Sequence, residues 1–252
     1  MGRKYNNPPL IEALCEFQFI PTEPYDSTIP GLFYTQIKGD FPEKQEQSGI
    51  GFTVQGSDTG IEQKITRIPS RVQFLNKDKT KLVQLAPDLL VINCLKPYPS
   101  WEEFKPIIVK NMDIYREIAK PKGFRRIGLR YINVFEFDSL NIELKDYFCY
   151  YPLVPQGFPN QLDAFLCRTE LPYQEERLIL TLATIMPENP NQLSITLDLD
   201  YVMNIPERIY FNDVSEWLDK AHERVENAFE ACITDKLRKK FEEAGNANSS
   251  NQ

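Results

Sequence analysis

Few side chains in this sequence could carry out catalysis. His222 is the single histidine, and it stands beside the apolar stripe of a predicted closing helix. A Ser–His–Asp or Cys–His arrangement could still use it, because such partners can be distant in sequence. No nucleophile-elbow motif accompanies it, however. We therefore favour a half-buried structural histidine and predict no catalytic residue.

Paired carboxylates are the next candidates for chemistry. Asp198 and Asp200 fall on one face of a predicted strand, because strand side chains alternate between faces, and such a pair could couple or bind a cation. Glu12, Glu16 and Glu170 are further acidic candidates. The apolar residues between the two aspartates favour the alternative, in which both carboxylates face water and the intervening residues face the core.

The sequence predicts no metal ion and no cofactor. The five cysteines are scattered, without the paired Cys or His spacing of a metal site. We interpret them as free, mostly buried thiols of a cytoplasmic protein. The glycines at 49, 51, 56 and 60 lack the spacing and flanking Lys of a phosphate-binding loop, so we interpret them as turn and edge-strand glycines.

Basic residues cluster between positions 116 and 130, opposed only by Glu117. The cluster contains Arg116, Lys120, Lys122, Arg125, Arg126 and Arg130. Arg130 and Tyr131 are adjacent in a predicted strand, where they could hold an acidic group or stack on a base. Exposed loop charges, with Arg130 in an internal ion pair, are the alternative. The formal net charge of -7 argues mildly against general nucleic-acid binding.

Two long amphipathic helices must position these residues. Apolar residues at three- and four-residue spacing predict a continuous closing helix over 214–241, capped by Asn212 or Asp213. The other helix begins at Trp101, where Ser100 and Glu103 form a capping box, and it stops before Pro121.

Alternating apolar residues and turn signals predict the strands. They cover 10–20, 50–55, one or two strands within 61–74, 81–85, 89–95, 124–137, 165–171, 178–185 and 193–203. A short helix is expected at 31–38, a polar loop at 43–48, and a helical or irregular segment at 142–150.

This order predicts an α+β fold built from a duplicated unit of strand, short helix, antiparallel meander and long helix. The halves are 1–122 and 123–244 within one compact domain, and each long helix carries a Trp in its first turn, Trp101 or Trp217. Convergent patterning is the alternative to duplication. We expect both long helices on one side of the antiparallel sheet, a groove between the halves, and a disordered tail at 245–252.

Several short phrases together carry a resemblance to a known family. They are NPPLIEA from Asn7, CEFQF from Cys15, SWEEF from Ser100, GLRYIN from Gly128, AHE from Ala221 and ITD from Ile233. Over essentially its whole length the chain resembles a sporadically distributed, functionally uncharacterised prokaryotic family whose members are about as long as these 252 residues. The resemblance implies a cytoplasmic protein of the accessory genome, compatible with a defence or toxin–antitoxin context. It brings no catalytic residues.

Three functions remain open from the sequence. The first is a non-enzymatic adaptor that binds a protein partner, or a second copy, through a groove or a sheet edge. The second is a small-ligand sensor with a pocket between the halves, formed by Arg130, Tyr131, Trp101 and Trp217. The third is a nucleic-acid accessory protein that uses the basic cluster. No membrane association is expected, because no stretch approaches the roughly 18 to 20 apolar residues of a membrane helix.

Overall fold

The computed structural model describes residues 3–57, 60–158, 162–187 and 189–241, with the side chains of 47–70 excepted. Its strands are β1 (Leu10–Ile20), β2 (Glu43–Ser57), β3 (Gly60–Leu75), β4 (Lys81–Ala86), β5 (Leu89–Leu95), β6 (Gly123–Phe137), β7 (Leu166–Tyr173), β8 (Glu176–Ile185) and β9 (Leu193–Met203). Its helices are α1 (Ile29–Ile37), α2 (Trp101–Ala119), α3 (Leu144–Tyr147), α4 (Val214–Cys232) and α5 (Asp235–Arg238), with 3₁₀ turns η1 (Phe211–Asp213) and η2 (Lys239–Phe241).

All the strands of the described chain join one nine-stranded antiparallel sheet, in the order β2-β3-β4-β5-β1-β6-β9-β8-β7. The first strands of the two halves, β1 and β6, pair at its centre. The α+β class is therefore confirmed, and the two meanders join edge to edge in a single sheet.

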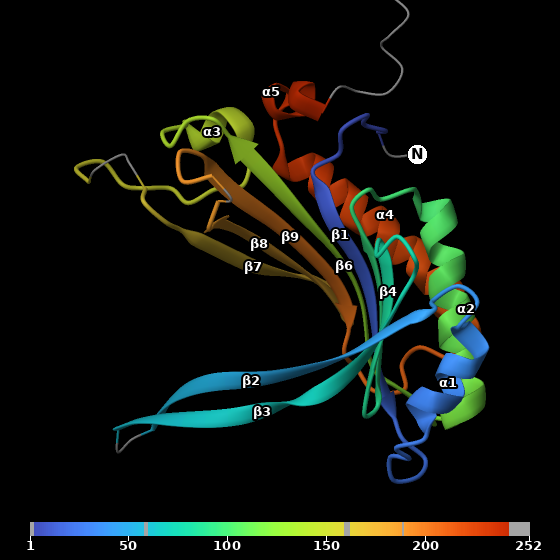
Figure 1. Ribbon diagram of the computed structural model, residues 1–252. Helices are drawn as coiled ribbons and strands as arrows, with labels where there is room; N and C mark the ends of the chain where they lie inside the picture. Colours follow the sequence, from blue (N-terminus) through green and yellow to red (C-terminus); the bar gives the residue numbers. More distant parts are fainter. Residues whose placement is uncertain (1–2, 58–59, 159–161, 188, 242–252) are drawn as a thin grey trace, which may run out of the picture.

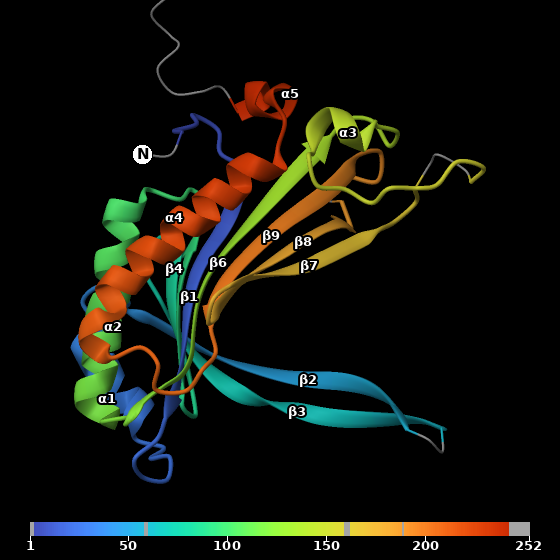
Figure 2. The same ribbon diagram turned by 180° about the vertical axis from the view of Figure 1, so that it is seen from behind.

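Helices α1, α2 and α4 cover one face of this sheet (Figures 1 and 2). The alternation in β1 explains why, because Ala13, Cys15, Phe17 and Phe19 are all buried toward the helices. Burying one Phe contributes roughly 1.5–3 kcal/mol, so a strand that buries two Phe side chains beside Ala13 and Cys15 on one face determines which face the helices cover. Within the described chain the opposite face carries no helix, and the β2–β3 hairpin and the β7–β9 strands project on that side (Figure 1).

The predicted capping of α2 is confirmed. The Ser100 hydroxyl accepts a hydrogen bond from the Glu103 backbone N–H at 3.2 Å. At this end α2 is tied to α4, since the Trp101 indole N–H and the Lys105 ammonium both donate to Asp219, at 3.1 and 2.6 Å.

The prediction of one continuous closing helix is wrong. Helix α4 ends at Cys232, and Ile233 is extended and bridges to Phe148. Thr234 then caps the short helix α5, accepting from the Leu237 N–H. The apolar spacing in the sequence continues across this break, because Leu237 and Phe241 are still buried, at 1% and 6% exposure. These two residues belong to α5 and η2 and not to α4.

One other segment differs from prediction. Residues 43–48 are not a polar loop, because β2 already starts at Glu43, which pairs with Leu75. Residues 61–74 belong to one strand, β3, which is one of the two arrangements predicted. The register shifts between the pairs Gln47–Arg71 and Gly49–Ile68, so residues 69 and 70 of β3 lie opposite one residue of β2. The segment at 142–150 does contain a short helix, α3, and α1 starts at Ile29, with Pro30 in its first turn, where no N–H is needed.

Three further expectations concern the whole chain. All five cysteines are free, as predicted, although Cys149 is exposed and Cys167 is only partly buried. None of the described helices is long and apolar enough to cross a membrane. The tail predicted at 245–252 lies outside the described residues.

Candidate functional site

The helix-free face carries an ion-pair network at the centre of the sheet. Arg126 of β6 donates to Glu16 of β1 at 2.7 Å and to Asp200 of β9 at 2.8 Å. Arg130 binds Asp198 through two hydrogen bonds, of 2.7 and 2.5 Å. The two aspartates that sequence analysis singled out therefore do share a face, but they face guanidinium groups and are mostly shielded from water, at 16% and 18% side-chain exposure.

Gly128 leaves the space that this network needs. It lies opposite Glu16 in the β1–β6 pair, and a Cβ at this position would come within 2.8 Å of the Arg126 guanidinium. Any larger side chain would therefore displace Arg126 from the position in which it joins two carboxylates.

A chain of amide hydrogen bonds extends the polar band toward the other edge. Gln45 donates to Gln73 at 2.7 Å, Gln73 to Gln84 at 3.0 Å, Gln84 to Asn93 at 2.9 Å, and Asn93 to Glu12 at 2.6 Å. Each amide donates through nitrogen and accepts through oxygen, so the terminal carboxylate sets the orientation of the whole chain.

Burial raises the pKa of Asp200 from its ordinary 3.8 to about 6, although Arg126 and Arg130 oppose the shift. Hydrogen bonding to Asp198 raises the pKa of Arg130. The charged groups of the network thus satisfy one another. Glu16, Asp198 and Asp200 are each held by an arginine, while burial still opposes the ionised form of Asp200.

A second polar chain lies on the helix side of the sheet. The Tyr98 and Tyr131 hydroxyls are 3.0 Å apart, and the Tyr131 hydroxyl is 2.9 Å from His222 Nδ1. The imidazole stacks on Trp101 at 4.3 Å, and its Nε2 is 3.4 Å from Glu226. Burial lowers the pKa of His222 to about 4, so the ring is neutral at pH 7 and joins β6, α2 and α4 as a structural residue.

Trp217 also has a structural environment. Its indole N–H donates to the buried Glu176 carboxylate at 2.7 Å. The same carboxylate accepts from the Tyr201 hydroxyl at 2.6 Å and pairs with Lys220 at 2.7 Å. This contact anchors the first turn of α4 on strands β8 and β9.

The four residues predicted to form one ligand site are therefore not brought together. Arg130 and Tyr131 are neighbours in β6, so their side chains lie on opposite faces of the sheet. Trp101 and Tyr131 both contact His222, whereas Trp217 lies against Glu176.

The basic cluster is divided as well. Arg126 lies on the helix-free face in two ion pairs, whereas the Arg116 guanidinium lies 5.4 Å over the ring of Phe211. Lys120 caps the C-terminus of α2 and Lys122 leads into β6. Arg125 is exposed at the start of β6. Arg126 and Arg130 are thus engaged in ion pairs on the helix-free face, apart from the residues at the end of α2.

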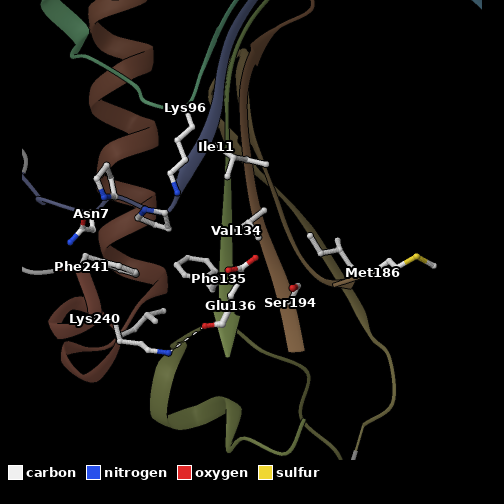
Figure 3. A pocket seen from close by; sticks show the side chains of 14 residues that line it. Asn7, Ile11, Lys96, Val134, Phe135, Glu136, Met186, Ser194, Lys240 and Phe241 are labelled. Carbon is white, nitrogen blue, oxygen red and sulfur yellow. Dashed lines mark hydrogen bonds between the residues drawn. The ribbon is translucent and has the colours of Figure 1, made fainter. Parts of the chain in front are cut away.

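An open pocket of about 650 Å³ lies where β1 separates from β6 (Figure 3). Its lining residues are Asn7, Pro8, Pro9, Ile11, Lys96, Val134, Phe135, Glu136, Ile185, Met186, Ser194, Leu237, Lys240 and Phe241. The two halves of the chain both contribute to this wall. No local signal predicts this site, because its residues come from six separate segments without a common motif.

The backbone explains why the pocket opens here. The β1–β6 pairing ends at the hydrogen bond from the Val134 N–H to Pro9, of 2.9 Å, and the preceding chain turns away, so that the Asn7 N–H donates to Phe241 at 3.0 Å. Strand β6 continues to Phe137, paired with Leu193 of β9. Within the described chain, residues 135–137 therefore have a strand partner on the β9 side only.

The pocket rim combines apolar and basic side chains. Met186 is 93% exposed, and Ile11 and Ile185 are each 38% exposed. Lys96 and Lys240 also line the rim (Figure 3), and neither forms an ion pair with another described residue. The Lys240 ammonium instead reaches the Glu136 carbonyl oxygen at 3.4 Å.

No group of three or more His, Cys, Asp or Glu side chains that could hold a metal ion occurs in the part of the chain that the structure describes. A second open pocket, of about 500 Å³, lies beside α3 and includes Leu153, which is 85% exposed.

Comparisons with known proteins identify no relative. No family model matches the sequence, and no curated protein matches it. Among solved structures, the S. pombe Pct1 RNA triphosphatase shows a TM-score of 0.14 at 9% identity, over 94% of this chain and 81% of that one. Its complex with the Spt5 CTD shows a TM-score of 0.13 at 9% identity, over 92% and 81%. These likenesses carry no argument about fold or function.

Proposed function

We propose that this protein is a non-enzymatic adaptor that binds an extended segment of a protein partner in the pocket at the end of β6. The observation that carries the proposal is the edge of β6 beyond Val134, where Glu136 has no strand partner on the β1 side within the described chain. The almost fully exposed Met186 lines the same pocket from the end of β8, on the far side of β9. A partner segment that continued the path of β1 would pair with the Glu136 backbone and reach the apolar wall of the pocket with its side chains.

The side chains at the rim indicate the chemistry of that segment. Ile11, Ile185 and Met186 favour an apolar residue, and the flexible Met thioether adapts to different shapes. Lys96 and Lys240 favour an acidic side chain or a terminal carboxylate. The expected ligand is therefore a short extended peptide with an apolar residue next to a negative charge.

The charged residues elsewhere support binding rather than catalysis. The carboxylates at the sheet centre are held by Arg126 and Arg130, and His222 is stacked and hydrogen-bonded in the core. A catalytic base needs access to a substrate proton, and these contacts leave neither group with such access.

The small-ligand sensor is the second candidate, because the pocket volume lies within the range of small-molecule sites and both halves line it. The open walls and the strand edge favour a peptide. The division of the basic cluster gives the nucleic-acid alternative less support.

The wider context is also part of the proposal. We infer a duplicated unit from the strand order. From the centre of the sheet outward, each half places its first strand (β1 or β6), then its last strand (β5 or β9), and then the strand before the last (β4 or β8). The resemblance of the sequence to a functionally uncharacterised prokaryotic family supports a cytoplasmic role in a prokaryotic defence or toxin–antitoxin system.

Selection of displayed random peptides on the full chain tests the adaptor proposal. The peptides recovered should be apolar and acidic. Met186→Ser should weaken the binding of a selected peptide about tenfold, because an apolar contact is lost. Lys240→Glu should weaken it further by charge repulsion. The matched controls are Leu153→Ser at the second pocket and Lys239→Glu next to Lys240, and both should bind like the wild type.

Two outcomes would reject the adaptor. Peptides whose affinity is unchanged by both pocket substitutions bind elsewhere on the protein. A small molecule that stays on the protein purified from its host, and that no selected peptide displaces, would identify a sensor instead. Native mass spectrometry detects that retained mass directly.

A further inference from the structure

Strand β7 presents an open edge at one end of the sheet. It is the last strand in the order, after β8, and no described segment pairs with its outer side (Figure 2). Six of its eight residues are exposed, including Leu166 at 70%. Long exposed edges are templates for pairing with another strand, so natural proteins usually block them.

The hydrogen-bond pattern shows which residues face outward. The Thr184 N–H donates to the Phe165 carbonyl at 3.1 Å, just before β7 begins. Because bonded and non-bonded positions alternate in antiparallel pairs, Cys167, Thr169, Leu171 and Tyr173 bond to β8. The N–H and C=O groups of the alternate residues point outward.

Pro172 agrees with this assignment. It has no N–H, and it falls on an outward position, where a proline in a strand costs no hydrogen bond to a neighbour. The outward positions are therefore Leu166, Arg168, Glu170 and Pro172, and all of them belong to the helix-free face of the strand.

The charges on this edge are self-complementary. If a second β7 runs antiparallel with Thr169 opposite Thr169, then Arg168 of each copy lies opposite Glu170 of the other. These are outward positions in both copies, so each such pair also exchanges backbone hydrogen bonds. Arg168 and Glu170 already lie 2.9 Å apart on one edge, and Arg177 holds Glu170 from the neighbouring strand at 3.0 Å.

The remaining side chains fit the same register. On the helix side Cys167 faces Leu171 of the other copy, and Thr169 faces its own equivalent. The Thr169 hydroxyl is 2.8 Å from the Tyr150 hydroxyl of its own chain, so the two Thr169 side chains meet through their methyl groups. Leu166 faces Pro172. A parallel arrangement in register would instead place like charges side by side, so the antiparallel arrangement is preferred.

We propose that β7 is a homodimerisation edge, through which two copies of this chain join their nine-stranded sheets into one continuous sheet. The two-fold axis passes midway between the two Thr169 residues, perpendicular to the sheet, so the helix layers of both copies lie on the same face. This edge is separate from the pocket at the end of β6, and the dimer does not depend on the adaptor proposal.

A charge-reversal series tests this register with the full chain. Sedimentation velocity from about 1 μM to about 1 mM should show a dimer that increases with concentration in the wild type. Arg168→Glu and Glu170→Arg should each weaken dimerisation by about tenfold or more, because both cross-strand ion pairs become repulsive. An equimolar mixture of the two variants should dimerise again, and so should the double variant R168E/E170R.

Two further variants separate edge pairing from other effects. Glu170→Pro removes an outward N–H at a position like that of Pro172, so it should fold normally by circular dichroism and remain monomeric. Lys110→Glu makes the same change of net charge as Arg168→Glu on α2, where Lys110 is 57% exposed, and it should dimerise like the wild type.

The proposal is overturned if the wild type is monomeric over the whole concentration range. It is equally overturned if a dimer forms but the mixture of Arg168→Glu and Glu170→Arg fails to restore it, because another surface must then mediate the contact. Neither result affects the peptide-binding test at Met186 and Lys240, so failures of the two proposals are distinguishable.

Discussion

Replacing Asp200 by Asn should change how the stability of the protein depends on pH, because Asp200 and His222 titrate in the same range with opposite effects. Asp200 has an ordinary pKa of 3.8 and a folded pKa of about 6. Its protonation therefore stabilises the fold at acid pH, and this contribution is lost as pH rises through about 6. His222 has an ordinary pKa of 6.5 and a folded pKa of about 4. Its contribution is present above pH 6.5 and is lost as pH falls toward about 4.

The size of each effect follows from these pKa values. Between about pH 5 and about pH 7, Asp200 lowers the free energy of unfolding by about 1.3 kcal/mol, and His222 raises it by about 1.9 kcal/mol. The two slopes nearly cancel in the wild type, which should gain only about 0.6 kcal/mol from this pair. Asp200→Asn should expose the His222 slope, with a gain of about 1.9 kcal/mol over the same range.

Urea denaturation at several pH values measures these slopes. The companion variant His222→Asn keeps an amide near the Tyr131 hydroxyl, and its stability should fall by about 1.3 kcal/mol from about pH 5 to about pH 7. Asp40→Asn removes an exposed carboxylate, 60% accessible, and controls for net charge. Glu226, whose pKa is raised chiefly by desolvation, lies 3.4 Å from His222, so its background is common to the wild type, Asp200→Asn and Asp40→Asn but not to His222→Asn. If the Asp200→Asn curve runs parallel to that of the wild type, Asp200 is not perturbed and the reasoning fails.

Three further substitutions test individual contacts by the free energy of unfolding in urea. Arg126→Met leaves Glu16 and Asp200 partly buried without their shared cation, so it should lower the free energy of unfolding by about 3 kcal/mol. A loss below about 1 kcal/mol would mean that water replaces the guanidinium. Trp217→Phe removes the indole N–H from the buried Glu176 and should cost about 1–3 kcal/mol. If Trp101→Phe lowered the free energy of unfolding by the same amount, the loss would reflect the removal of an indole ring in general and not the contact with Glu176. Thr234→Ala removes the cap of α5 and should cost about 1 kcal/mol, while Thr234→Ser, which keeps the hydroxyl, should be close to the wild type.

Local patterns in the chain were sufficient for most of the elements. Alternation in β1 and β9 predicted strands and their buried faces, because a strand's side chains repeat every second residue. The Ser100 cap was predictable for a similar reason, since it involves only residues within one helical turn. The errors arose where tertiary contacts overrode local preference. The closing helix breaks at Ile233 because that residue bridges to Phe148, which lies 85 positions earlier in the printed sequence.

The candidate sites show the same division. From the sequence alone, Asp198 and Asp200 could be assigned to one face, and Arg130 could be considered for an internal ion pair. Which arginine meets which carboxylate depends on the register of β1, β6 and β9, and register is a property of the assembled sheet.

The pocket and the open edge were decided by tertiary structure only. The pocket exists because the chain that precedes Pro9 turns away from β6, and β7 is an edge because the strand order ends there. Neither fact has a local signal, since each depends on where distant segments stop pairing. The sequence by itself determined an α+β chain with two amphipathic helices and a paired-charge strand face, because those properties arise from periodicity. The surfaces available for partners were decided by strand order and register, because hydrogen bonding between strands joins residues that are distant along the chain.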